Sequence, residues 1–121
     1  MALLITRPAS GSSTIPGASY SGVIVAPTES VTVDTLPASA VPSVKWLITL
    51  IDATTGRTLG YEVFALNKFG VDVTHTKYAM IGDTIFHELS VNIYEQNIIL
   101  HIQNNDTTSF TVHVVRINTT H

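Results

Sequence analysis

Apolar and polar side chains alternate along most of the chain beyond residue 42, in short runs that are separated by turn-forming residues. In one of these runs, Ile98, Leu100 and Ile102 lie on one side, and the polar residues between them lie on the other. A period of two residues is typical of a strand that buries one of its faces. The pattern predicts six strands, at residues 44–51, 59–66, 71–80, 85–94, 98–103 and 110–117.

These strands indicate an all-β fold, because no stretch repeats its apolar residues with the period of a helix. Thr, Val and Ile are abundant, and β-branched side chains suit a pleated surface better than a helix. The connections are too short for crossover helices, so neighbouring strands are expected to be antiparallel. The sequence therefore predicts a single antiparallel β-sandwich, Ig-like or jelly-roll-like, with about 7–8 strands and an extended N-terminal arm.

The arm is the segment of residues 1–42, which is rich in Ser, Thr, Ala and Pro. All five prolines lie in it, and proline removes a backbone donor that a sheet interior needs. Two short apolar runs, at residues 22–26 and 30–34, are candidate edge strands. We therefore expect an assembly arm at residues 1–42 and a sandwich domain at residues 43–121. The residues expected to anchor the arm on a neighbouring subunit are Leu3, Leu4, Ile5, Ile15 and Tyr20.

The chain carries few charges for its 121 residues, since 12% are Asp, Glu, Lys or Arg, which is about half of the usual share. A polar but uncharged surface costs less to desolvate than a charged one. This composition favours a chain that other subunits partly cover, and we expect a homo-oligomer. The net charge of −3 and the scattered basic residues argue against binding to nucleic acid.

The apolar runs are all short. None approaches the roughly 20 residues of a membrane span, and the run at residues 2–5 is shorter than the core of a signal peptide. We therefore expect no membrane association and assembly in the cytoplasm. The chain has no cysteine, which excludes a disulfide framework, cysteine-bound zinc and a thiol nucleophile.

Catalytic and cofactor motifs are missing, including the nucleophile elbow G-x-S-x-G, the phosphate loop, the zinc motif H-E-x-x-H and the EF-hand. Asp52, Asp83, Glu95 and Asp106 all lie in predicted turns, where an Asp bonds nearby backbone N–H groups. A pair of catalytic carboxylates needs two such groups facing one cleft, which the sequence does not indicate. We expect no enzymatic activity and no cofactor.

Four histidines, His75, His87, His101 and His113, fall in four successive predicted strands. Hairpins bring such positions side by side, and imidazole is a common metal ligand. The alternative is that each is a polar residue on the solvated face or at a subunit contact that responds to pH. His101 and His113 alternate with apolar neighbours, which favours the solvated face. We therefore expect no metal site.

The predicted strands carry residues in a particular order. A Lys-Trp-Leu-Ile strand at residues 45–48 precedes a Tyr-Glu-Val-Phe-Ala-Leu strand at 61–66 and a Thr-His-Thr-Lys-Tyr-Ala-Met-Ile-Gly-Asp segment at 74–83. The last strand, at 112–117, alternates and has an Arg near its end. This order, over residues 44–117, resembles small β-sandwich modules of tailed-bacteriophage virion proteins, in tail or neck fibres or head decoration. The resemblance implies no catalytic residues.

Such modules often lie in long fibre proteins, sometimes in several copies, whereas here one module follows an arm. We therefore expect a separate, non-enzymatic bacteriophage virion protein that binds other virion proteins and oligomerises through its arm, in the tail, the neck or the capsid decoration. The alternative is a carbohydrate- or receptor-binding module on the virion. Its ligand contacts would lie on the hairpin loops at residues 52–57 or 104–108.

Overall fold

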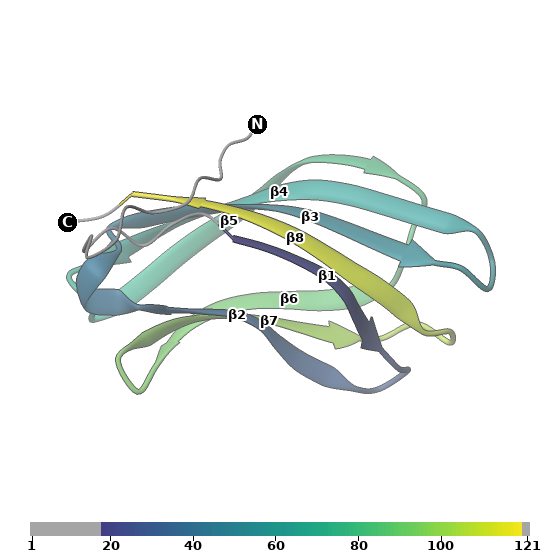
Figure 1. The fold of residues 1–121 in the computed structure, drawn as a ribbon, viewed down its shortest axis with the longest axis horizontal. Coiled ribbons are helices and arrows are strands. Elements are labelled where there is room, and N and C mark those ends of the chain that lie inside the picture. The colour runs from purple at the N-terminus through teal and green to yellow at the C-terminus, as the bar shows by residue number, and fades with distance from the viewer. Residues whose placement is uncertain (1–17, 120–121) are drawn as a thin grey trace.

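The computed structural model describes residues 18–119 and has eight strands, which form two antiparallel sheets packed face to face (Figure 1). This confirms the predicted β-sandwich, and the six strands expected beyond residue 42 correspond to the last six observed. Across residues 18–119 the only helical element is the short 3-10 turn η1 at Ala38–Ala40, so no helix there is long enough to cross a membrane. The strands are β1 (Ala18–Val25), β2 (Ser30–Pro37), β3 (Ser43–Asp52), β4 (Arg57–Lys68), β5 (Asp72–Gly82), β6 (His87–Tyr94), β7 (Asn97–Asn104) and β8 (Phe110–Asn118).

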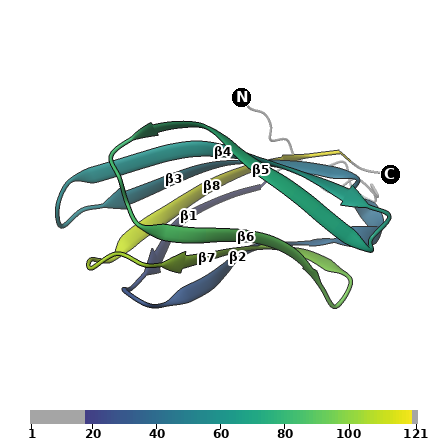
Figure 2. The same cartoon turned by 180° about the vertical axis from the view of Figure 1, so that it is seen from behind.

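The strand order is β1-β8-β3-β4-β5 in the larger sheet and β2-β7-β6 in the smaller one. The pairing is nested, because β1 pairs with β8 and β2 pairs with β7, while β3, β4 and β5 follow one another as hairpins. Figure 2 shows β5 and β6 at the near edge of the two sheets. Since five strands face three, β5 extends beyond the smaller sheet, and its side chains are almost all exposed on both faces.

Residues 18–37, which the sequence analysis placed in the arm, form two complete strands of the sandwich. The prolines of this part do not interrupt a sheet interior, because Pro27 lies in the turn after β1, Pro37 ends β2 and Pro42 precedes β3. Of the expected arm anchors, Tyr20 lies in β1 opposite Val114. Leu3, Leu4, Ile5 and Ile15 lie outside the described residues.

The core lies between the two sheets and is almost entirely apolar. Alternate residues of β3, β4, β7 and β8 point into it, as the period of two residues predicts. The largest fully buried side chains are Trp46, Tyr61 and Phe110. Removal of these side chains from water is the main stabilising contribution to the fold.

One charged pair is buried in this apolar core. Asp34 of β2 is 3% exposed and Arg116 of β8 is 6% exposed, so the pair joins the smaller sheet to the larger one. Arg116 Nη1 donates to both carboxylate oxygens of Asp34, at 2.9 and 3.0 Å. Trp46 Nε1 donates to the same carboxylate at 2.9 Å. The two sheets are therefore aligned by a directional polar contact as well as by packing.

Candidate functional site at the loop end of the sandwich

Four connections lie together at one end of the sandwich: β1–β2, β3–β4, β5–β6 and β7–β8 (Figure 1). Strand β8 ends at the opposite end, where Ala18 pairs with Arg116. We call the first end the loop end. It includes both hairpin loops that the sequence analysis proposed for ligand contacts, residues 52–57 and 104–108, and the structure brings them into direct contact.

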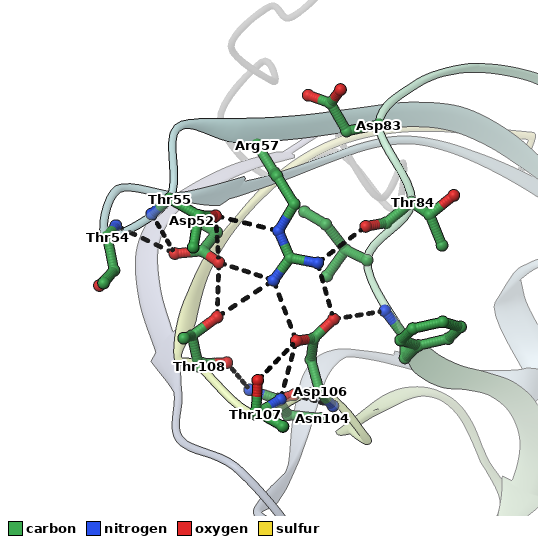
Figure 3. Close-up of polar contacts among 12 residues, drawn as sticks. Asp52, Thr54, Thr55, Arg57, Asp83, Thr84, Asn104, Asp106, Thr107 and Thr108 are labelled. Atoms are coloured by element: carbon green, nitrogen blue, oxygen red, sulfur yellow. Dashed lines mark hydrogen bonds and ion pairs between the residues drawn. The ribbon is translucent and has the colours of Figure 1, made fainter.

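Arg57, the first residue of β4, lies at the centre of a polar network at the loop end (Figure 3). Its Nη2 donates to Asp52 Oδ2 at 2.8 Å and to Asp106 Oδ1 at 2.9 Å. Its Nη1 donates to Asp106 Oδ2 at 3.1 Å and to the backbone carbonyl of Thr84 at 3.0 Å. One guanidinium therefore holds the β3–β4, β5–β6 and β7–β8 loops together, which its planar fork of donors allows.

Asp52, at the end of β3, is the more deeply buried of the two carboxylates, with a side chain that is 1% exposed. It accepts hydrogen bonds from the backbone N–H groups of Thr54 and Thr55 at 3.0 and 3.2 Å, as expected for an Asp that shapes a turn. The hydroxyl groups of Thr55 and Thr108 also donate to it. Asp52 thus shapes its own hairpin and binds the β7–β8 loop.

Asp106 has the same double role in the β7–β8 loop, with a side chain that is 5% exposed. It accepts hydrogen bonds from the backbone N–H groups of Phe86, at 2.9 Å, and Thr107, at 2.7 Å. Asn104, which is fully buried, also holds the loop in place. Its amide nitrogen donates to the carbonyls of Val25 and Thr108 at 2.8 and 2.9 Å, so β1 is also tied to this end.

The contacts at the loop end determine the pKa values, and so the charge states, of its ionisable side chains. Hydrogen bonds from Thr108 and Arg57 lower the pKa of Asp52 well below its usual range, and the Arg57 guanidinium does the same to the pKa of Asp106. The two carboxylates in turn raise the pKa of Arg57. Both acids therefore remain ionised and engaged with donors at neutral pH. Such groups are unsuited to general acid or base catalysis, which needs a pKa near the working pH.

His87 lies beside the loop end, between the two sheets. Its Nδ1 lies 2.8 Å from the carbonyl of Ile85, so Nδ1 carries the proton and donates, and Nε2 accepts from the hydroxyl of Tyr61 at 2.7 Å. The ring stacks on Tyr61, with centroids 5.6 Å apart, and meets the edge of Phe110. Burial lowers the pKa of His87 and raises that of Tyr61. Both rings therefore act as packed, uncharged groups at neutral pH.

The other three histidines of the predicted series lie on three further strands, His75 on β5, His101 on β7 and His113 on β8. His101 is within 3.4 Å of the Thr32 hydroxyl. Between Ala18 and Thr119, no group of three or more His, Asp or Glu side chains is arranged to hold a metal ion.

From the sequence, Asp52 and Asp106 were predictable only as turn residues, and their link through Arg57 was not predicted. One feature of the sequence could have indicated this link: Arg57, one of only six basic residues, lies at the end of a loop that begins with Asp52. The contact with Asp106, 49 positions away, depends on how β3 and β4 lie against β7 and β8. Local sequence spacing carries no information on that arrangement.

Comparison with known proteins supports the fold. No family model and no curated protein matches this chain. Among solved structures, the crystal structure of the Acinetobacter phage vB_ApiP_P1 tailspike protein is similar, with a TM-score of 0.60 and 14% sequence identity. The similarity covers 98% of this chain and 25% of the tailspike chain, so this chain spans about a quarter of that length. At this identity, the similarity concerns the fold alone.

Proposed function

We propose that this protein is a non-enzymatic structural component of a bacteriophage particle, which assembles as a homo-oligomer and binds other virion proteins. The observation that carries this proposal is the fold similarity to a segment of a phage tailspike, which extends over 98% of the chain. The low content of charged residues also supports it, because a surface with few charges is cheaper to cover with other subunits. The polar network at the loop end supports a structural role, since its ionised groups are engaged with one another.

The expected contribution of the N-terminal residues is tested by the mass of the protein in solution. The shortened chain must begin at Ala18, because a chain beginning at Ser43 would lack β1 and β2 and would expose the core. We expect light scattering to show a defined oligomer for the full chain. The shortened chain is expected to associate more weakly, so that it becomes monomeric at protein concentrations at which the full chain is still an oligomer. Equal association of the two chains would contradict a role for residues 1–17, and a monomeric full chain would contradict the homo-oligomer.

The second candidate function is a carbohydrate- or receptor-binding module. It is favoured by the position of Phe86, which is 62% exposed at the loop end and whose backbone N–H is held by Asp106. Aromatic rings presented on rigid loops are suited to stacking against a ligand. This function predicts glycan binding by the full chain on an array and its loss in Phe86→Ala, with Tyr94→Ala, a similarly exposed aromatic residue in β6, as the control. Absence of glycan binding, or equal loss in both variants, would contradict it.

A further inference from the structure

A group of large apolar side chains is exposed on and around β4 and β5, on the outside of the larger sheet and along its edge. We call this the β4–β5 surface. Its exposed fractions run from 38% for Phe64 and Tyr78 to 94% for Phe69. Several large apolar side chains exposed on one side of a sheet indicate an interaction site. The residues of the surface are Leu47, Phe64, Leu66, Phe69, Val71, Tyr78, Met80 and Ile81.

The edge of this surface is β5, which has 11 residues and one strand neighbour, β4. An edge strand of this length presents a row of backbone N–H and C=O groups that suit pairing with another strand. Natural edges are protected by proline, by charged side chains or by β-bulges. Here β5 contains no proline, and its bulge, opposite Gly60 and Glu62 and with Ala79 at a φ of 56°, lies near its end. The ladder with β4 is regular from Asp72 to Tyr78, so this part of the edge is the part suited to pairing with another strand.

The charges within the β4–β5 surface balance one another. Lys45 Nζ lies 2.8 Å from Glu62 Oε1, and the Tyr78 hydroxyl donates to the same oxygen at 2.9 Å. Two copies of this face therefore meet without repulsion between like net charges, as an interface between identical chains requires.

The shape of the surface is also complementary to itself. Leu47, Met80 and Ile81 line a hollow of about 450 Å³ near the end of β5, and Phe69 projects almost fully exposed just before its start. When two copies of a strand pair in an antiparallel direction, the start of one lies beside the end of the other. An axis near His75 brings Phe69 of one copy beside Ile81 of the other, at the hollow.

We propose that a second copy of this chain docks on the β4–β5 surface, with the two β5 strands pairing antiparallel about a two-fold axis near His75. The proposal rests on the proposed function, of which it names one contact. Pairing through β5 covers the exposed apolar side chains on and next to that strand, Phe69, Val71, Tyr78, Met80 and Ile81, while those of β3 and β4 stay outside the contact. The pairing also joins the two larger sheets into one, so that the β5 edge of each copy is closed.

A matched pair of substitutions tests the surface. Ile81→Lys adds a charge at the β5 edge, and Ile24→Lys adds the same charge on β1, at the opposite edge of the same sheet. The two side chains are 74% and 66% exposed, so neither substitution disturbs the core. We expect Ile81→Lys to weaken self-association of the full chain by about 10–100-fold, measured by sedimentation, and Ile24→Lys to leave it unchanged.

The chain has no cysteine, so single cysteines report directly on the two-fold axis. His75→Cys is expected to form a disulfide-linked dimer on mild oxidation, because residues opposite each other in an antiparallel pair lie within disulfide range. Asp72→Cys, on the same strand but away from the axis, is expected to stay unlinked. This measurement uses an almost unchanged chain and does not depend on the folding of Ile81→Lys.

The three possible outcomes distinguish failure of the β4–β5 contact from failure of the proposed homo-oligomer. An oligomer that dissociates with Ile81→Lys and is cross-linked by His75→Cys supports the β4–β5 contact. An oligomer that neither variant affects overturns the contact and leaves the proposed homo-oligomer in place. A wild-type chain that stays monomeric overturns the proposed homo-oligomer and the contact with it.

Discussion

Replacing Asp34 with alanine is expected to lower the free energy of unfolding by about 3–5 kcal/mol. The substitution removes the carboxylate that Arg116 and Trp46 contact, while the guanidinium of Arg116 stays 94% buried in an apolar core, as its 6% exposure implies. Removing one partner of a buried ion pair is among the largest costs that a single substitution produces. Chemical denaturation, followed by the fluorescence of Trp46, the only tryptophan, measures the change.

A double substitution controls for the loss of packing at the same place. Asp34→Leu with Arg116→Met replaces both charged groups by apolar ones, and a buried ion pair exchanged for well-packed apolar side chains often costs little. We expect the double variant to be more stable than Asp34→Ala and more stable than either Asp34→Leu or Arg116→Met alone, so that these two single substitutions are strongly non-additive. A loss of less than about 1 kcal/mol in Asp34→Ala would show that the pair contributes no more than an ordinary hydrogen bond.

Replacing Arg57 with methionine is expected to destabilise the loop end and to lower the midpoint of thermal unfolding by more than about 5 °C. It leaves Asp52 and Asp106 buried without the guanidinium that neutralises them, and it breaks the link between three loops. Lys68→Met is the matched control, since Lys68 is an exposed basic residue at the other end of the same strand. Equal shifts in the two variants would contradict the role of Arg57.

The effect of Arg57→Met is expected to depend on pH. In the wild-type fold, hydrogen bonds and the Arg57 charge hold the pKa values of Asp52 and Asp106 below their usual range. Carboxylates with lowered pKa values stabilise the folded state above the unfolded value of about 4, and this contribution is lost as the pH falls further. The difference in unfolding midpoint between wild type and variant is therefore expected to be largest at neutral pH and to narrow below about pH 4. A difference in unfolding midpoint that stays the same at every pH would contradict this role of the two carboxylates.

Burial of His87 also makes the stability depend on pH, in a range just above that of the two carboxylates. The two contributions therefore have to be separated. Because burial lowers the pKa of His87, the unfolded chain takes up a proton more readily than the folded chain below the unfolded value of about 6.5. Stability therefore also decreases as the pH falls below about 6.5 in both the wild type and Arg57→Met. Since this contribution is common to both, their difference isolates the carboxylates.

The strand pattern was predictable from the sequence because burial of one sheet face is a local, periodic requirement. Each of β3, β4, β7 and β8 shows the alternation in its own residues, and the connections are too short for anything but antiparallel neighbours. Arg116 is in phase with the buried residues Phe110, Val112 and Val114 of the same strand. Residues 18–37 belong to the sandwich and not to the predicted arm, because Pro27 lies in a turn and Pro37 is the last residue of β2, where a missing backbone donor does not interrupt a sheet interior.

The polar contacts of the fold depended on tertiary structure. In β2, strict alternation with Val33 would place Asp34 on the solvated face, but the register shifts between Thr32 and Asp34, and both Val33 and Asp34 are buried. Such a bulge re-aims one side chain and brings Asp34 to Arg116, 82 residues away. Arg57 meets Asp106 for a similar reason, across 49 residues.

The class of fold, the antiparallel order of neighbouring strands and the apolar face of each strand are encoded locally, since they depend on residues close together in the chain. Which loops meet, which charges pair and how far β5 extends beyond the smaller sheet are set by the fold as a whole. Those features depend on the nested pairing of distant strands. The free energy that selects this pairing is spread over the whole core between the two sheets.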